Sequence, residues 1–372
     1  SQQYLMDCII QAFPDEYHLH SLEKLLQTCG HMMQNNLSED NIYQINGQVT
    51  QISEVIVINS LINRLSEFVE NSEEVEEIKA QVDIFSLFKK NIDKIIEEQA
   101  LQIELAKLLE LQVAFLKFVS QCYPGNIDYV NQILSSCCNL CSKRSSTDIN
   151  DESQKNIVSL LTLPLESLSI TVLGLADYPH LMKFLPFKKR KIVAQNIARV
   201  TFFFFSNFTN ATFRLLAVAN SGTNLRDLKI VNQLIDFLVP ILKDDPENQD
   251  PDPTEFAAEQ TLVARIVHLA VHNDANEYYA MLNRFKEVFL AGGEKRMAFT
   301  IPALFYGYLK LADFIHFSQT SQSEEAYDPS TTPANYKVVN HRFMPFRGDL
   351  SFDLVAIYHV CRELLQKLAL TE

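Results

Sequence analysis

Glycine is scarce in this sequence, which contains only 9 glycines among 372 residues, whereas glycine makes up about 7% of average proteins. Glycine adopts positive φ without steric cost, so nucleotide-binding loops, hairpin turns and strained catalytic elbows depend on it. The scarcity therefore argues against a β-sandwich, a Rossmann enzyme or a P-loop ATPase. It favours helices stacked on helices, because the connections between helices need few special turns.

Basic charge is also low, with 32 Lys and Arg against 46 Asp and Glu, which gives a net charge of −14. Such a surface repels phosphate backbones, so we expect neither nucleic-acid binding nor a general attraction to anionic membranes. The sequence also lacks the GxGxxG, GxxxxGK and GxSxG motifs and any evident pair of catalytic carboxylates. We therefore expect a binding scaffold, with no enzymatic activity, no cofactor and no metal.

The start of the chain and its cysteines indicate a cellular compartment. Ser1 leads directly into an amphipathic helical pattern, with no secretory signal before it. The cysteines are odd in number, 7, and most of them fall within apolar helical stripes. We therefore expect buried thiols in a reducing compartment. Because the first residue is not Met, we also expect the chain to be a fragment.

Apolar residues recur with helical spacing along most of the chain, for example at Ile58, Leu61, Ile62 and Leu65. No segment shows the alternation and turn residues of a β-hairpin. Short polar breaks divide the sequence into roughly fourteen to sixteen helices, or one helix pair per about 40–47 residues, which is the spacing of HEAT repeats. The predicted fold is all-α, a right-handed α-solenoid of HEAT-like helix pairs.

Polar segments suggest how the solenoid is divided. We predict a first part over residues 1–243, an acidic linker over 244–252 and a second solenoid part over 253–372. Within these parts, polar stretches predict loops at 36–51 and 144–155 and a flexible loop at 318–348. Asp252, followed by Pro253 and Glu255, predicts the N-cap and capping box of a new helix.

Two groups of residues resemble metal or redox sites. His268 and His272 have the i, i+4 spacing of zinc-binding helices, but position 269 is Leu where a catalytic Glu would stand in HExxH. Packing of one histidine and exposure of the other is the favoured interpretation. The same holds for Cys137, Cys138 and Cys141, which lie on an apolar stripe without a second CxxC pair, so that core packing is favoured.

Two further segments could contact a membrane. Lys188, Lys189, Arg190 and Lys191 form the densest basic run and could contact anionic lipid or act as a nuclear localisation signal, although a solvated helix face is favoured. Residues 197–219 are apolar, but Arg199 and Arg214 would each cost about 2.5–3.5 kcal/mol in a bilayer centre. We therefore interpret this segment as a core helix.

Several motifs occur in the same order as in a known family. They are the segment QQYLMDCIIQAFPDEYHL at 2–19, INRL at 62–65, CYP at 122–124 with IDYV at 127–130, LLTLPL at 160–165, and DPDPTEFAAEQTLVARIVHL at 250–269. With these motifs the chain resembles the family of large α-solenoid subunits of the retromer coat. The similarity extends from residue 2 to about residue 314 and decreases within 318–348.

The resemblance implies a scaffold that sorts transmembrane cargo from endosomes to the trans-Golgi network or plasma membrane. It implies arrestin-fold and metallophosphatase-fold subunits, sorting nexins, a small Rab-type GTPase and cargo tails as partners, with coat self-assembly through a C-terminal end that this chain lacks. The implied location is cytoplasmic and peripheral on endosomal membranes, with indirect membrane contact. The PRLYL-type motif with which the family binds the arrestin-fold subunit does not occur here.

The junction of the two predicted solenoid parts is the candidate partner-binding region. It contains Asp250, Asp252, Phe256 and Arg265. Capping by Asp252 and core packing by Phe256 are the favoured alternatives for those two residues. A different class of function also stays open, namely a cytosolic α-solenoid transport adaptor that is recruited directly to anionic lipid through Lys188–Lys191.

Overall fold

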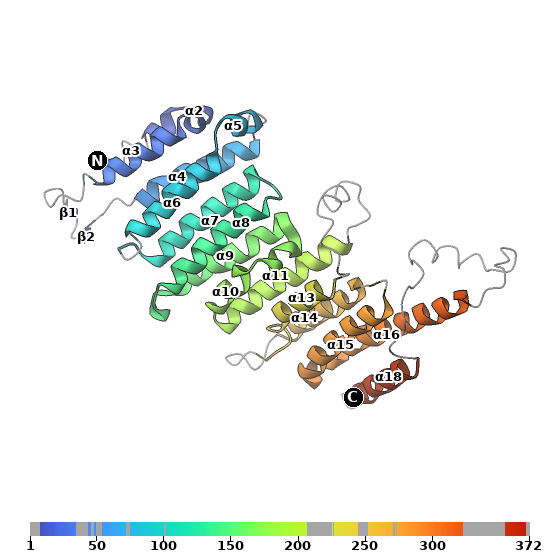
Figure 1. The fold of residues 1–372 in the computed structure, drawn as a ribbon. Helices are drawn as coiled ribbons and strands as arrows, with labels where there is room; N and C mark the ends of the chain where they lie inside the picture. Colours follow the sequence, from blue (N-terminus) through green and yellow to red (C-terminus); the bar gives the residue numbers. More distant parts are fainter. Residues whose placement is uncertain are drawn as a thin grey trace. The chain divides into compact units, whose positions relative to one another are not determined.

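The structure is a computed structural model, and it describes most of the chain. The described residues are 8–34, 44–45, 48–49, 54–71, 75–99, 102–206, 225, 227–244, 252–270, 272, 274–322 and 354–369. They form two compact units, one over 1–168 and 175–189, the other over 169–174 and 190–372. Figure 1 shows successive helices lying side by side within each unit.

The first unit consists of helices that pack against their neighbours in the sequence. Its elements are α2 (Asp15–His20), α3 (Leu22–Gln34), β1 (Gln44–Ile45), β2 (Gln48–Val49), α4 (Glu54–Asn71), α5 (Val75–Gln81), α6 (Ile84–Gln99), α7 (Leu105–Cys122), α8 (Ile127–Ser142), η3 (Ser146–Asp148), α9 (Asp151–Leu168) and α10 (Asp177–Lys183). Helix α7 packs against α4, α8 and α9. It is therefore the centre of the unit, and Leu108, Phe115 and Phe118 on it are completely buried.

The second unit repeats this arrangement. It contains η4 (Ser169–Gly174), most of α11 (Phe187–Ser206), α13 (Leu228–Leu238), α14 (Pro253–Ile266), η5 (Val267–Leu269), α15 (Ala275–Ala291), α16 (Glu294–Gln322) and α18 (Leu354–Leu368). Helix α16 packs against α14, α15 and α18. Its buried face includes Leu304, Tyr308 and Leu311. The prediction of an all-α solenoid built from successive packed helices is confirmed, and the right-handed sense of the superhelix stays a prediction.

A short antiparallel strand pair differs from the loop predicted over 36–51. Gln44 pairs with Val49 and Ile45 with Gln48. The residues between the strands are Asn46 and Gly47, and Asn-Gly is the dipeptide that two-residue hairpin turns favour. Every other element in the described ranges is a helix.

The other predicted loops are shorter than expected where the structure describes them. Within 144–155, η3 occupies 146–148 and α9 begins at Asp151, because the side chain of Asn150 accepts a hydrogen bond from the Ser153 N–H at 2.8 Å. Residues 318–322 belong to α16, and 323–348 lie outside the described residues. Of the predicted linker 244–252, only Asp244 and Asp252 are described, and the proposed division at this linker stays a prediction.

One stretch, Asp151–Gly174, is long and apolar enough to cross a membrane by length and composition. It comprises α9 and η4, and 56% of its most apolar window is buried inside the protein. Leu160, Leu161 and Leu165 of α9 belong to the core of the first unit. A core helix accounts for these features. The run predicted as a core helix at 197–219 is described only as far as Ser206, within α11.

Candidate functional site

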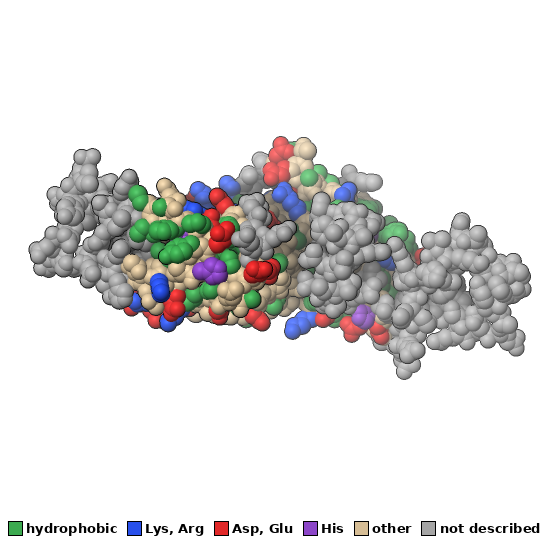
Figure 2. Space-filling model, turned by 90° about the horizontal axis from the view of Figure 1, so that it is seen from above, with side chains coloured by type: hydrophobic (Ala, Val, Ile, Leu, Met, Phe, Trp, Pro, Cys, Tyr) green, Lys and Arg blue, Asp and Glu red, His purple; other side chains and the backbone are tan. Residues whose placement is uncertain are grey.

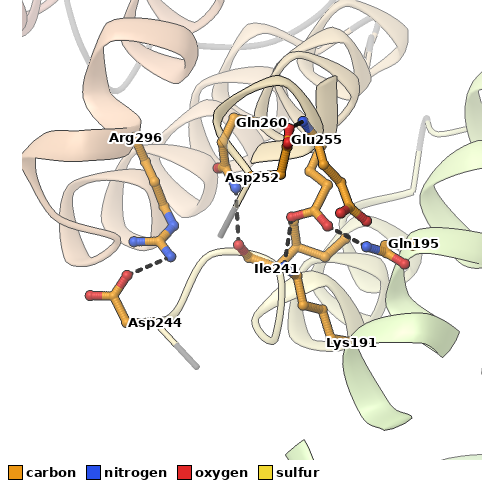
Figure 3. A network of polar contacts seen from close by, with 9 residues as sticks. Lys191, Gln195, Ile241, Asp244, Asp252, Glu255, Gln260 and Arg296 are labelled. Carbon is orange, nitrogen blue, oxygen red and sulfur yellow. Dashed lines mark hydrogen bonds and ion pairs between the residues drawn. The ribbon is translucent and has the colours of Figure 1, made fainter. Parts of the chain in front are cut away.

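The sequence predicts an N-cap at Asp252, and the structure confirms this cap at the start of α14 (Figure 3). The Asp252 Oδ1 atom accepts hydrogen bonds from the N–H groups of Thr254 at 2.8 Å and Glu255 at 3.0 Å, with Pro253 in the first turn. These backbone donors, Glu255 first, hold the pKa of the Asp252 carboxyl below its ordinary value. A capping box also requires the Glu255 side chain to accept a hydrogen bond from the Asp252 N–H. That bond is absent between these two described residues.

One helical turn further, a buried carboxylate connects α14 to α11. Glu259 is 8% exposed, and its Oε2 atom forms an ion pair with Lys191 Nζ at 2.9 Å. The Gln195 side chain, one turn after Lys191 on α11, donates a hydrogen bond to Glu259 Oε1. Figure 3 shows Lys191 and Gln195 directed from their helix toward α14. A buried carboxylate thus receives one charged and one neutral donor, which offset part of its desolvation cost.

The next residue, Gln260, and a buried arginine connect α14 and α16 to the segment after α13. The Gln260 side chain is fully buried and donates a hydrogen bond to the Ile241 carbonyl at 3.1 Å. Arg296, in the first turn of α16, donates to the Gly292 carbonyl and to Asp244 Oδ1, each at 2.8 Å. Since Asp244 is largely exposed and Arg296 is 5% exposed, the carboxylate lies at the surface end of this contact. These side chains fix helix positions within the second unit.

The predicted partner-binding residues take part in this packing to different degrees. Phe256 is half-buried, with the Arg296 guanidinium 5.3 Å from its ring centre and the Phe299 ring at 6.1 Å edge-on. Arg265 is exposed, with its guanidinium 5.4 Å from the Phe202 ring centre. Asp250 lies outside the described residues. The structure thus brings Asp252, Phe256 and Arg265 onto one helix, α14, and a partner-binding role for them stays a prediction.

The basic run at the start of α11 is partly neutralised by acidic side chains. In the first unit, Lys189 Nζ forms an ion pair with Asp151 Oδ1 at 3.0 Å. In the second unit, Lys191 forms an ion pair with Glu259. Lys188 is exposed and Arg190 half-buried. On the face drawn in Figure 2, the Lys and Arg side chains of the described residues lie interspersed with Asp and Glu. Two of the four charges therefore have acidic partners, which weakens the run as a lipid-binding patch.

The two candidate zinc-binding histidines do not share one helix. Helix α14 ends at Ile266, and His268 lies in the short η5, where its ring contacts Tyr306 edge-on. Burial, with a smaller effect of Lys310, lowers the pKa of His268. His272 Nδ1 accepts a hydrogen bond from the Asp274 N–H at 2.9 Å and so holds the segment before α15. The spacing of the histidines was correct for a zinc helix, but the early helix end removes that geometry.

The cysteines of α8 behave mainly as core residues, as the sequence predicted. Cys137 and Cys141 are completely buried. Burial raises the pKa of the Cys141 thiol to about 12 and that of Cys137 well above its usual value. Both thiols are therefore protonated at neutral pH. Cys138 is half-buried and lies on the side of α8 that faces α10.

Sequence reasoning missed the polar residues that connect the helices. Glu259, Gln260 and Arg296 are buried, and each contacts a residue outside its own helix. The available signal was a charged or amide residue at a position where the helical stripe requires an apolar one. That signal predicts a buried polar contact but does not identify the partner.

The fold and this site define a class, an α-solenoid protein whose polar side chains are engaged in contacts between stacked helices. The family model for vacuolar protein sorting-associated protein 35 matches residues 1–371, and the chain belongs to that family.

Curated relatives agree with this assignment. Vacuolar protein sorting-associated protein 35A of Arabidopsis thaliana is 31% identical over 315 residues, covering 84% of this chain and 36% of the relative. The 35B protein of the same plant is 28% identical over 345 residues, covering 91% and 39%. Vacuolar protein sorting-associated protein 35 of Dictyostelium discoideum is 28% identical over 316 residues, covering 83% and 36%. The chain thus spans between 36% and 39% of the length of these relatives.

Proposed function

We propose that this chain acts as a non-catalytic scaffold in the retromer coat. In this role it contributes to the sorting of transmembrane cargo from endosomes to the trans-Golgi network or the plasma membrane. The observation that supports the proposal most is the family match over nearly the whole chain. The helical stack is consistent with it, since stacked helix pairs present extended surfaces to several partners. The proposed location is cytoplasmic and peripheral on endosomal membranes.

The proposed partners are the arrestin-fold and metallophosphatase-fold subunits of retromer, together with sorting nexins, a small Rab-type GTPase and cargo tails. A pull-down with the purified chain as bait and each of the two subunits as prey tests the proposal. Binding of the metallophosphatase-fold subunit is the expected result. The proposal would be contradicted if neither subunit binds to the chain while its helical content is intact.

Helix α14 is the proposed contact surface for such a partner. Arg265 is the most suitable residue of α14 to substitute, because its side chain is exposed and its guanidinium contacts the Phe202 ring. Asp252 and Phe256 support the surface by capping and packing α14, and Asp250 precedes them in the sequence. We expect Arg265→Glu to weaken subunit binding, with Arg362→Glu on the exposed face of α18 as the control. Equal binding by both variants would remove α14 from the interface.

The alternative is a transport adaptor that is recruited directly to anionic lipid through Lys188–Lys191. The ion pairs of Lys189 and Lys191 with Asp151 and Glu259 reduce the positive charge available there. Flotation with vesicles that contain an anionic phospholipid tests the alternative. Lys188→Glu changes the exposed charge without breaking a pair, so reduced flotation of this variant would favour direct lipid contact, and unchanged flotation would exclude it for this residue.

A further inference from the structure

Three side chains of different chemistry meet where α8 and α10 pack together in the first unit. Cys138 comes from α8, and Asp177 and His180 come from α10. One sulfur, one carboxylate oxygen and one imidazole nitrogen lie within 4.8 Å of one another. His180 Nδ1 is 3.7 Å from Asp177 Oδ1. Residues 138, 177 and 180 were not grouped by sequence reasoning, which considered the α8 cysteines alone.

The donor set is one that zinc uses. A thiolate, an imidazole and a carboxylate bind Zn²⁺ at about 2.0–2.3 Å, and three protein ligands leave a fourth tetrahedral position open. In such a site the donors lie about 3.5 Å apart. The three donor atoms here lie within 4.8 Å of one another, and His180 Nδ1 and Asp177 Oδ1 are 3.7 Å apart, so small changes of side-chain rotamer would bring them to coordinating distance.

The surroundings of the three side chains support this geometry. The Ser135 hydroxyl, one turn before Cys138 on α8, donates a hydrogen bond to Asp177 Oδ2. This bond orients the carboxylate and leaves Oδ1 facing His180, which is the arrangement that supporting residues give to metal ligands. Cys138 is half-buried whereas the His180 side chain is 55% exposed. An ion can therefore enter from solvent on the histidine side.

We propose that Cys138, Asp177 and His180 form a binding site for a zinc-type divalent cation that fastens α10 to α8. On binding, the thiol proton of Cys138 passes to solvent and the thiolate Sγ coordinates the ion. Since the two helices belong to one compact unit, a bound ion stabilises the packing of α8 on α10 by mass action. The fourth position is filled by water.

Titration of the chelator-treated 372-residue chain with Co²⁺, followed by displacement with Zn²⁺, tests the proposal. We expect one equivalent of Co²⁺ with a thiolate-to-cobalt charge-transfer band, which disappears on addition of Zn²⁺. Cys138→Ala and His180→Ala should abolish the band. The controls Cys8→Ala and His359→Ala remove the same residue types at half-buried and exposed positions elsewhere and should retain it. Ser135→Ala should weaken Co²⁺ binding by about 10-fold or more.

A second measurement separates metal binding from effects on folding. Zn²⁺ should raise the melting temperature of the unaltered chain and leave that of His180→Ala unchanged, and both should have the same helical content by circular dichroism. No charge-transfer band in the unaltered chain would overturn the proposal. A band retained by both Cys138→Ala and His180→Ala would do so as well.

Discussion

The ion pair between Lys191 and Glu259 gives a quantitative test of the contact between α11 and α14. Exposed ion pairs contribute about 0–1 kcal/mol to stability, whereas removal of one partner from a buried pair costs about 3–5 kcal/mol. Here Glu259 is 8% exposed and Lys191 22%, and Glu259 keeps its hydrogen bond from Gln195. We therefore expect Lys191→Met to destabilise the second unit by about 2 kcal/mol, between these limits.

The comparison with other variants isolates the cause. Lys191→Met keeps most of the aliphatic volume and removes the charge, so that Glu259 stays buried without its cation. In the double variant Lys191→Met, Glu259→Met neither charge is buried, and we expect it to be more stable than Lys191→Met alone. The matched control is Lys155→Met, because Lys155 pairs with Asp151 at 3.1 Å with both side chains about two-thirds exposed. That control should change stability by less than about 0.5 kcal/mol.

Thermal unfolding and amide hydrogen exchange provide the measurements. A loss of 2 kcal/mol corresponds to a decrease in melting temperature of about 4–8 °C for a unit of this size. Exchange should accelerate in α11 and α14 and stay unchanged in α4 and α7 of the other unit. The reasoning is refuted if Lys191→Met and Lys155→Met have equal effects, or if the double variant loses the sum of both single losses.

Three further substitutions test separate features of the fold. Gln112 on α7 is completely buried, and neither the nitrogen nor the oxygen of its amide has a hydrogen-bond partner among the described residues. Gln112→Met should therefore stabilise the protein by about 1–2 kcal/mol, measured by chemical denaturation. A loss of stability would contradict this. Asp252→Ala removes the cap of α14 and should lower the melting temperature at pH 7. The lowered pKa of Asp252 means that its stabilisation is present above the ordinary carboxyl pKa of 3.8 and is lost as the pH falls below it, so the difference between the variant and the unaltered chain should shrink in acid. In Gly307→Ala the new Cβ would lie 2.8 Å from Leu282 Cδ2, and Leu282 is fully buried. The overpacking cost of about 1–3 kcal/mol should therefore exceed the helix-propensity gain of about 1 kcal/mol, so that the variant is destabilised. Gly174→Ala is the control, because the space around Gly174 is open.

The sequence predicted those features that depend on neighbouring residues. The helix start at Asp252 followed by Pro253 was correct because a cap and its N–H donors lie within one turn of each other. The packing of the α8 cysteines was predictable from the apolar stripe on that helix. By contrast, the strand pair at Gln44–Val49 was missed although Asn46-Gly47 marks such a turn.

The contacts between helices could not be predicted in the same way. The spacing of apolar residues shows which face of α14 is buried. It does not show which side chains of another helix contact that face. Gln195 and Glu259 are 64 residues apart in the chain, and no local pattern connects them. The grouping of Cys138 with Asp177 and His180 likewise depends on how α10 turns back onto α8, which only the packed structure reveals.

The packing of helices against near neighbours has a consequence for how the chain acquires its structure. Side-chain hydrogen bonds between helices join Gln195 to Glu259, 64 residues apart, and Lys286 to Glu363, 77 residues apart. Because most helices pack against near neighbours in the sequence, their contacts need less loop closure than contacts between distant parts of a chain, so each helix pair can form soon after its residues leave the ribosome. Folding of a stack like this can begin at more than one place and extend along the chain. The nascent protein therefore need not wait for its last residues before it buries its first core.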